Sequence, residues 1–256
     1  MAVENGEWVM RGLRWDDPYR IRTWQELVGY INEVGFLPLF ANEIPGFSAE
    51  EHVSPDYWWT GSREQDPWEW REIIAASHQA AYGKFFDKKA GFISMEWLPY
   101  FANFRRNGYD FDSAWEDGRV TRREKLIMDI LTDTDSGGDI VWTDKQILTT
   151  DLKRLAGFGK GGEKNFPGIT TELMMKLFLV TADFHRRRNK RGDEYGMAVS
   201  VLLPPEAVWG YGQVTAAYDE EPAVSWQRIC DRIKQVFPSA ENESIVRLVG
   251  KQPRET

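Results

Sequence analysis

Apolar and polar residues alternate with two different periods along residues 122–203, and the change of period predicts the local fold. Apolar residues first recur every three or four positions, as on one face of a helix, and later at every second position, as on one face of a strand. The resulting order is helix, short strand, helix, helix and β-hairpin, which is the order of a winged helix. The expected helices are 121–131, 150–156 and 169–178, and the expected strand segments are 140–142, 180–184 and 197–203.

The alternation also predicts which side chains of the hairpin face the core. These are Val180, Ala182 and Phe184 on the first strand and Met197, Val199, Val201 and Leu203 on the second. The helix at 169–178 takes the place of the recognition helix, the element that enters the major groove in winged-helix proteins.

Residues 20–94 show the same order of elements in a looser form. Thr23 can cap a helix over 23–34. An apolar, strand-like run follows at 36–40, where Pro38 excludes a central position in a sheet. Asp66 before Pro67 then predicts the start of a second helix, and segments 81–86 and 90–93 predict a hairpin. The pattern therefore favours two related units in tandem.

The predicted fold class is α+β, with tandem winged-helix units (a helix-turn-helix plus a β-hairpin wing) and a C-terminal helical segment. Helical spacing returns at 223–237 and 243–249, after Pro204 and Pro205 end the sheet. The expected divisions are an N-terminal arm (1–20), a first winged-helix-like unit (21–108), a second winged-helix domain (109–205) and the C-terminal segment (206–256).

Composition limits the classes of function. The chain of 256 residues carries a formal net charge of −8, so binding to nucleic acid would need a local basic patch. The single cysteine, Cys230, excludes an internal disulfide, and with three scattered histidines it argues against a thiolate zinc site. We expect no metal and no cofactor. No signal peptide and no long apolar run is present, which predicts a cytoplasmic protein without a membrane partner.

A dense cationic run lies at the tip of the predicted hairpin. It consists of Arg186, Arg187, Arg188, Lys190 and Arg191. Arginine and lysine at a wing tip contact phosphates or enter a minor groove, which makes DNA the first expected partner. The alternative is a solvated hairpin tip whose charge serves solubility.

Polar residues near the predicted recognition helix extend this candidate interface. The candidates are Thr170, Thr171 and Lys176 of the helix region and Lys160 and Lys164 of the glycine-rich segment before it. That segment lacks the spacing of a phosphate-binding P-loop, so a turn between two helices is the better interpretation. The alternative for the helix is a purely structural role.

Residues 82–86, Tyr-Gly-Lys-Phe-Phe, and 90–100, beginning Ala-Gly-Phe-Ile-Ser, carry a family resemblance. An aromatic strand, a strand of small residues and a helix with proline and an aromatic residue follow one another there. This stretch resembles the AlkZ-type bacterial DNA glycosylases, and the order of elements agrees over residues 23–203. The resemblance implies tandem winged helices and the removal of alkylated or crosslinked bases.

The catalytic signature of those glycosylases is Gln-x-Gln or Gln-x-Asp after a glycine that follows the first helix. The matching segment here follows Gly35 and has Pro38 and Phe40 at the two positions. Neither side chain can position a water or stabilise a cationic sugar by charge. We therefore predict a nucleic-acid-binding relative without this catalysis. The alternatives are a glycosylase or hydrolase that uses another carboxylate, Glu69 or Glu43, and a module that binds another protein.

Overall fold

The computed structural model describes residues 2–4, 7–134, 140–142, 146–189 and 191–253. The longer helices are α1 (Trp24–Val34), α2 (Pro67–Ser77), α3 (Leu98–Arg106), α5 (Arg122–Leu131), α7 (Phe166–Met175), α10 (Pro222–Val236) and α11 (Asn242–Val249), and the shorter ones are α4 (Phe111–Glu116), α6 (Thr149–Leu155), α8 (Pro205–Trp209) and α9 (Tyr211–Val214). The strands are β1 (Ala2–Glu4), β2 (Glu7–Val9), β3 (Phe36–Pro38), β4 (Ala80–Phe86), β5 (Lys89–Ser94), β6 (Thr132–Thr134), β7 (Ile140–Trp142), β8 (Val180–Arg188) and β9 (Glu194–Leu203). The predicted α+β class is confirmed.

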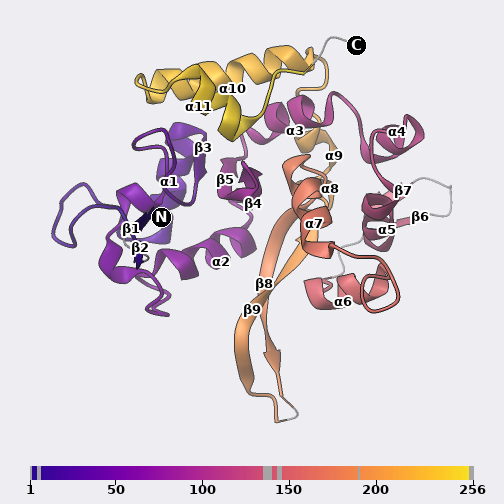
Figure 1. The fold of residues 1–256 in the computed structure, drawn as a ribbon, viewed down its shortest axis with the longest axis horizontal. Helices are drawn as coiled ribbons and strands as arrows, with labels where there is room; N and C mark the ends of the chain where they lie inside the picture. The colour runs from indigo at the N-terminus through magenta and orange to yellow at the C-terminus, as the bar shows by residue number, and fades with distance from the viewer. Residues whose placement is uncertain (1, 5–6, 135–139, 143–145, 190, 254–256) are drawn as a thin grey trace.

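One antiparallel sheet contains the hairpins of both expected units. Its strand order is β3-β5-β4-β8-β9, so the β4–β5 hairpin of the first half lies directly beside the β8–β9 hairpin of the second (Figure 1). The junction is the pairing of Tyr82 with Thr181. Buried apolar residues from both halves form one core cluster. The two halves therefore share a sheet and a core, and their division into tandem winged helices stays a prediction.

Local sequence signals place the first elements as expected. The Thr23 hydroxyl accepts a hydrogen bond from the third residue of α1, and Asp66 caps α2 with Pro67 in its first turn. β3 lies at the edge of the sheet and pairs only with β5 among the described strands. An edge position is where Pro38, which has no backbone N–H, is tolerated.

Helix α7 lies earlier in the chain than the alternation predicted. It runs from Phe166 to Met175, whereas the apolar spacing predicted 169–178. Pro167 fits the first helical turn, where its missing N–H costs no hydrogen bond. Leu177 has φ of 58°, outside the helical range, which ends the helix before Phe178.

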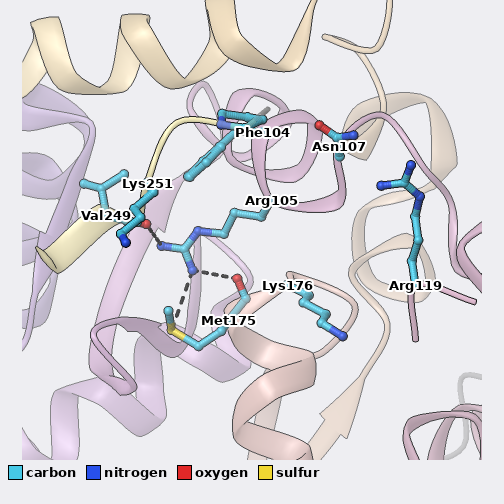
Figure 2. Close-up of a pocket in the computed structure, with 10 residues that line it drawn as sticks. Phe104, Arg105, Asn107, Arg119, Met175, Lys176, Val249 and Lys251 are labelled. Atoms are coloured by element: carbon cyan, nitrogen blue, oxygen red, sulfur yellow. Dashed lines mark hydrogen bonds between the residues drawn. The ribbon is translucent and has the colours of Figure 1, made fainter. Parts of the chain in front are cut away.

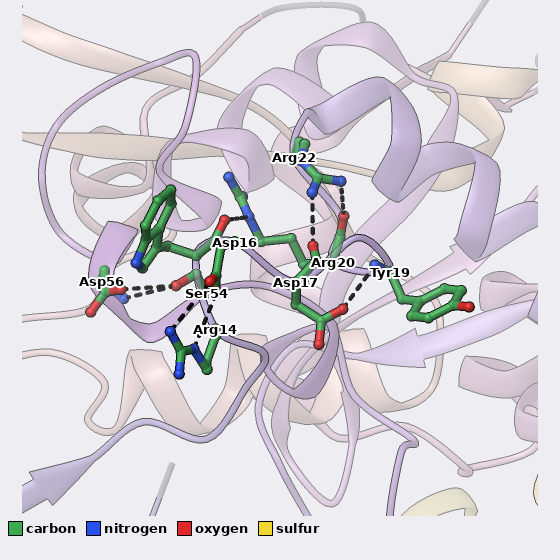
Figure 3. Close-up of polar contacts among 9 residues, drawn as sticks. Arg14, Asp16, Asp17, Tyr19, Arg20, Arg22, Ser54 and Asp56 are labelled. Carbon is green, nitrogen blue, oxygen red and sulfur yellow. Dashed lines mark hydrogen bonds and ion pairs between the residues drawn. The ribbon is translucent and has the colours of Figure 1, made fainter.

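The N-terminal segment lies across the first half of the molecule. After the β1–β2 hairpin, the Leu13 amide donates to the carbonyl of Val53, and the Arg11 amide donates to the carboxylate of Glu50. Residues 14–22 hold their own turns through polar contacts beside Ser54 (Figure 3). The bonds of Arg11 and Leu13, together with that from the Ile21 amide to the carbonyl of His52, attach residues 11–22 to the segment that follows β3.

The C-terminal helices close the side of the molecule away from the β8–β9 hairpin (Figure 1). α10 packs along α3, and the expected final helix is present as α11. Two short helices that the sequence pattern did not predict, α8 and α9, follow the sheet. No helix in the described part of the chain is long and apolar enough to span a bilayer.

Candidate nucleic-acid interface

The β8–β9 hairpin is buried at its base and projects from the body at its far end (Figure 1). Val180, Ala182 and Val201 are buried in the core, as predicted. Beyond them both strands continue past the neighbouring helices. The described residues of 185–199 form this projecting part, which is termed the arm.

The register between β8 and β9 shifts near Gly196. His185 pairs with Val199, but Arg187 pairs with Tyr195, so β9 contains extra residues between the two pairs. Gly196 has φ of 74°, a conformation that favours glycine. Bulges of this kind bend a hairpin and redirect its side chains.

The arm exposes cationic and apolar side chains together. Arg186, Arg187 and Arg191 are exposed. Tyr195 and Met197 are exposed by 51% and 89%. The expectation that Met197 faces inward was wrong, because the hairpin has left the core before it reaches this position. The side chain of Arg188 and the whole of Lys190, two of the predicted contacts, lie outside the described residues.

The base of the arm is attached to α2 by a stacked arginine. The Arg71 guanidinium lies 3.8 Å from the ring centre of Trp68 and 4.5 Å from that of Phe184, at the root of the arm. It also donates to Glu72 at 2.9 Å. Arg71 is buried, so this cation–π and ionic contact fixes the arm relative to α2.

Two carboxylates of α2 face this junction. Glu69 is buried and lies 3.9 Å from Arg186. Burial raises the pKa of Glu72, an effect that the nearby charge of Arg71 only partly offsets. Glu69 and Glu72 are three residues apart on α2 and therefore share a face of the helix, and β8 packs against α2. Glu43, the other carboxylate candidate, lies elsewhere and pairs with Arg247 at 2.6 Å.

A family model described as AlkZ related matches residues 21–250. The chain belongs to the AlkZ-related family. The match extends beyond the stretch that suggested the resemblance and includes the C-terminal helices. No curated protein and no solved structure matches the chain.

In this AlkZ-related protein, the residues that the sequence comparison placed at the expected glycosylase signature, Pro38 and Phe40, are packed apolar groups. Pro38 is buried in β3. Phe40 is half-buried, with its ring centre 5.5 Å from that of Trp58 and 6.3 Å from that of Trp68. Trp68 also stacks on Arg71. Phe40 is therefore connected through Trp68 to the junction that holds the base of the arm.

The hydroxyl groups of the two threonines expected at the interface form hydrogen bonds inside the fold of this AlkZ-related protein. Thr170 and Thr171 are buried, and both hydroxyls donate to backbone carbonyls of the first turn of α7. A side chain in this state presents no group to a base edge. Because both positions belong to the packed face of α7, their burial argues against the predicted role of these threonines as DNA contacts.

The lysines expected to extend the interface differ in their surroundings. Lys176 follows α7 and pairs with Glu124 at 2.6 Å, and Glu124 also forms the capping box of α5 with Thr121. Lys160 and Lys164 are exposed in the turn between α6 and α7.

Groups of three or more histidine, cysteine or acidic side chains with metal-binding geometry do not occur among the described residues.

Proposed function

We propose that this AlkZ-related protein binds nucleic acid through the arm and does not excise bases through the 38–40 position. The observation that carries the proposal is the joint exposure of Arg186, Arg187 and Arg191 with Tyr195 and Met197 on one projecting hairpin. Arginines supply phosphate contacts, and exposed apolar side chains enter grooves or lie against bases. Membership of the AlkZ-related family supports DNA as the nucleic acid.

Charge explains why the contact surface would be confined to the arm. The whole chain has a net charge of −8, which repels phosphate at long range. Because the hairpin projects from the body, the exposed Arg187 and Arg191 can reach a nucleic acid without the rest of the acidic chain lying against it. The anchoring of its base by Arg71 reduces the conformational entropy that binding would otherwise cost.

Fluorescence anisotropy with a short labelled duplex tests the proposal. The affinity of the wild-type protein should fall as salt rises, and Arg187→Ala should make the slope of log K against log salt shallower by about 0.9. Arg228→Ala, which removes an exposed arginine of α10, should leave the slope unchanged. Absence of binding to any duplex or single strand at low salt would contradict the proposal and favour a protein-binding role.

The second candidate function is base excision assisted by carboxylates of α2. The position of Glu72 beside the root of the arm favours it, because burial shifts the pKa of this carboxyl group upward, in the direction that a general acid requires. Release of an alkylated base from duplex DNA by the wild-type protein, lost in both Glu72→Gln and Glu69→Gln, would support this function. Base release that survives both substitutions would exclude it.

A further inference from the structure

Two arginine side chains of this protein are held by different kinds of partner. Arg105 lines a cavity between α3, α7 and the segment after α11, and its guanidinium donates to the backbone carbonyls of Met175 at 2.7 Å and Val249 at 3.1 Å (Figure 2). Arg186, at the root of the arm, instead lies 3.9 Å from the carboxylate of Glu69 on α2. Backbone carbonyls are fixed by the fold, whereas a side-chain ion pair is open to competition from another anion.

Glu69 depends on Arg186 for its charge compensation. The Glu69 side chain is only 9% exposed, and in the described part of the chain Arg186 is the one cation that forms an ion pair with it. The neighbouring cation of α2, Arg71, is already engaged by Glu72 at 2.9 Å and by the ring of Trp68. A buried carboxylate that loses its cation keeps an uncompensated charge. The fold therefore favours the state in which Arg186 stays beside α2.

The second carboxylate on this face of α2 also attracts Arg186. Burial raises the pKa of Glu72, and the charge of Arg186 is among those that oppose this rise. An anion that recruits Arg186 from α2 must therefore replace the attraction of both carboxylates.

Arg186 nevertheless remains accessible from solvent. Its side chain is 46% exposed. It lies where the register between β8 and β9 shifts, between His185 and Arg187. Arg187 is exposed, and no ion pair involves it among the described residues. Arg187 is thus available for a phosphate at once, whereas Arg186 must first leave Glu69.

We propose that Glu69 and Arg186 form an autoinhibitory latch, which holds one cation of the arm against α2 and weakens the binding of nucleic acid by the arm. This inference rests on the proposed function, because it concerns the restraint of the same surface. A backbone phosphate would compete with Glu69 for the guanidinium. Removing or shortening the Glu69 side chain should therefore strengthen binding.

Fluorescence anisotropy with a short labelled duplex at low salt tests the latch. Glu69→Gln should raise the affinity by about two- to fivefold, the range expected for release of a partly exposed ion pair. Glu69→Asp keeps the negative charge but withdraws the carboxylate from Arg186, so it should also raise the affinity, by a smaller factor. Circular dichroism would verify that both variants are folded.

Glu64→Gln is the matched control for the loss of one negative charge. Glu64 is exposed just before α2, and no ion pair involves it among the residues that the structure describes. Screening by salt limits the effect of an exposed charge that contacts no partner. This variant should therefore change the affinity by less than about 1.5-fold.

Arg186→Ala separates the latch from general charge effects. In this background Glu69→Gln should have no more effect than Glu64→Gln, because the latch is already absent. The same pair of substitutions tests the contact without nucleic acid. In urea denaturation their effects on stability should be non-additive, as expected for residues that interact directly.

A gain in affinity by Glu69→Gln that requires Arg186 would support the latch, including the case in which only Glu69→Gln binds. The latch alone would be overturned by an equal gain in Glu64→Gln, by an equal gain in the Arg186→Ala background, by additive effects on stability, or by no gain in either Glu69 variant. Absence of binding by the wild type and by every variant would overturn the latch together with the proposed function.

Discussion

Tyr82 of β4 pairs with Thr181 of β8, and this register position joins the hairpins of the two halves into one sheet. Tyr82 is buried, and its ring centre lies 6.1 Å from that of Phe184. The root of the arm is thus supported by α2 on one side and by β4 on the other. Changes in either half should affect the stability of the whole chain.

The first prediction concerns the buried ion pair between Arg106 of α3 and Glu206 of α8. Burial is the largest single effect and lowers the pKa of Arg106, but the charges and hydrogen bonds of Glu206 and Tyr218 together outweigh it, so the pKa is raised. Glu206→Ala should lower the free energy of unfolding by about 3–5 kcal/mol, because it leaves an uncompensated buried cation. Urea denaturation measures this value. The double variant Arg106→Met with Glu206→Leu should recover most of the loss, and equal instability of the two variants would contradict this account.

The second prediction concerns the pH dependence that Glu72 contributes. Burial raises its folded-state pKa above the ordinary value of a glutamate side chain. The folded state therefore holds this proton more tightly than the unfolded state, and stability declines as pH rises from that value through the folded pKa. Glu72→Gln should be more stable than the wild type at neutral pH and show little difference at about pH 4.

Thermal unfolding across this pH range measures the effect. Glu243→Gln is the matched control, because Glu243 is an exposed acid of α11. It should show no such dependence. A Glu72→Gln variant that is less stable at neutral pH than at acidic pH, relative to wild type, would reverse the assigned sign.

The third prediction concerns the thiol of Cys230 on the buried face of α10. Burial, with a smaller contribution from the charge of Asp231, raises its pKa to about 12. Because the thiolate is the reactive form, iodoacetamide should leave the folded protein almost unlabelled at about pH 8. Mass spectrometry should show complete labelling in urea. Rapid labelling of the folded protein would mean that α10 opens readily.

The fourth prediction compares two glycines. A Cβ atom at Gly91 would lie 2.5 Å from the Phe86 ring and 2.8 Å from the carbonyl oxygen of Leu37. Gly91→Ala should therefore destabilise the sheet by about 1–3 kcal/mol. Gly29→Ala, in the exposed middle of α1 with no atom near the added Cβ, should stabilise by about 0.5–1 kcal/mol. Similar effects at both positions, measured by urea denaturation, would contradict the close packing of β5 on β4 and β3.

The sequence alone predicted the elements that depend on local chemistry. The caps at Thr23 and Asp66, the edge position of Pro38 and the helix over residues 121–131 require only neighbouring residues and backbone sterics. The family resemblance was carried by residues 82–100, and the AlkZ-related family is confirmed over residues 21–250.

The tertiary structure decided which of these residues reach solvent or a common site. Thr170 and Met197 both fit a regular periodicity, yet the first is buried and the second is exposed, because exposure depends on where the core ends. The pairing of β4 with β8 and the meeting of Arg105 with Lys251 join residues far apart in the chain. Periodicity describes one element at a time, so it determines the face of each helix or strand but cannot determine what lies against it.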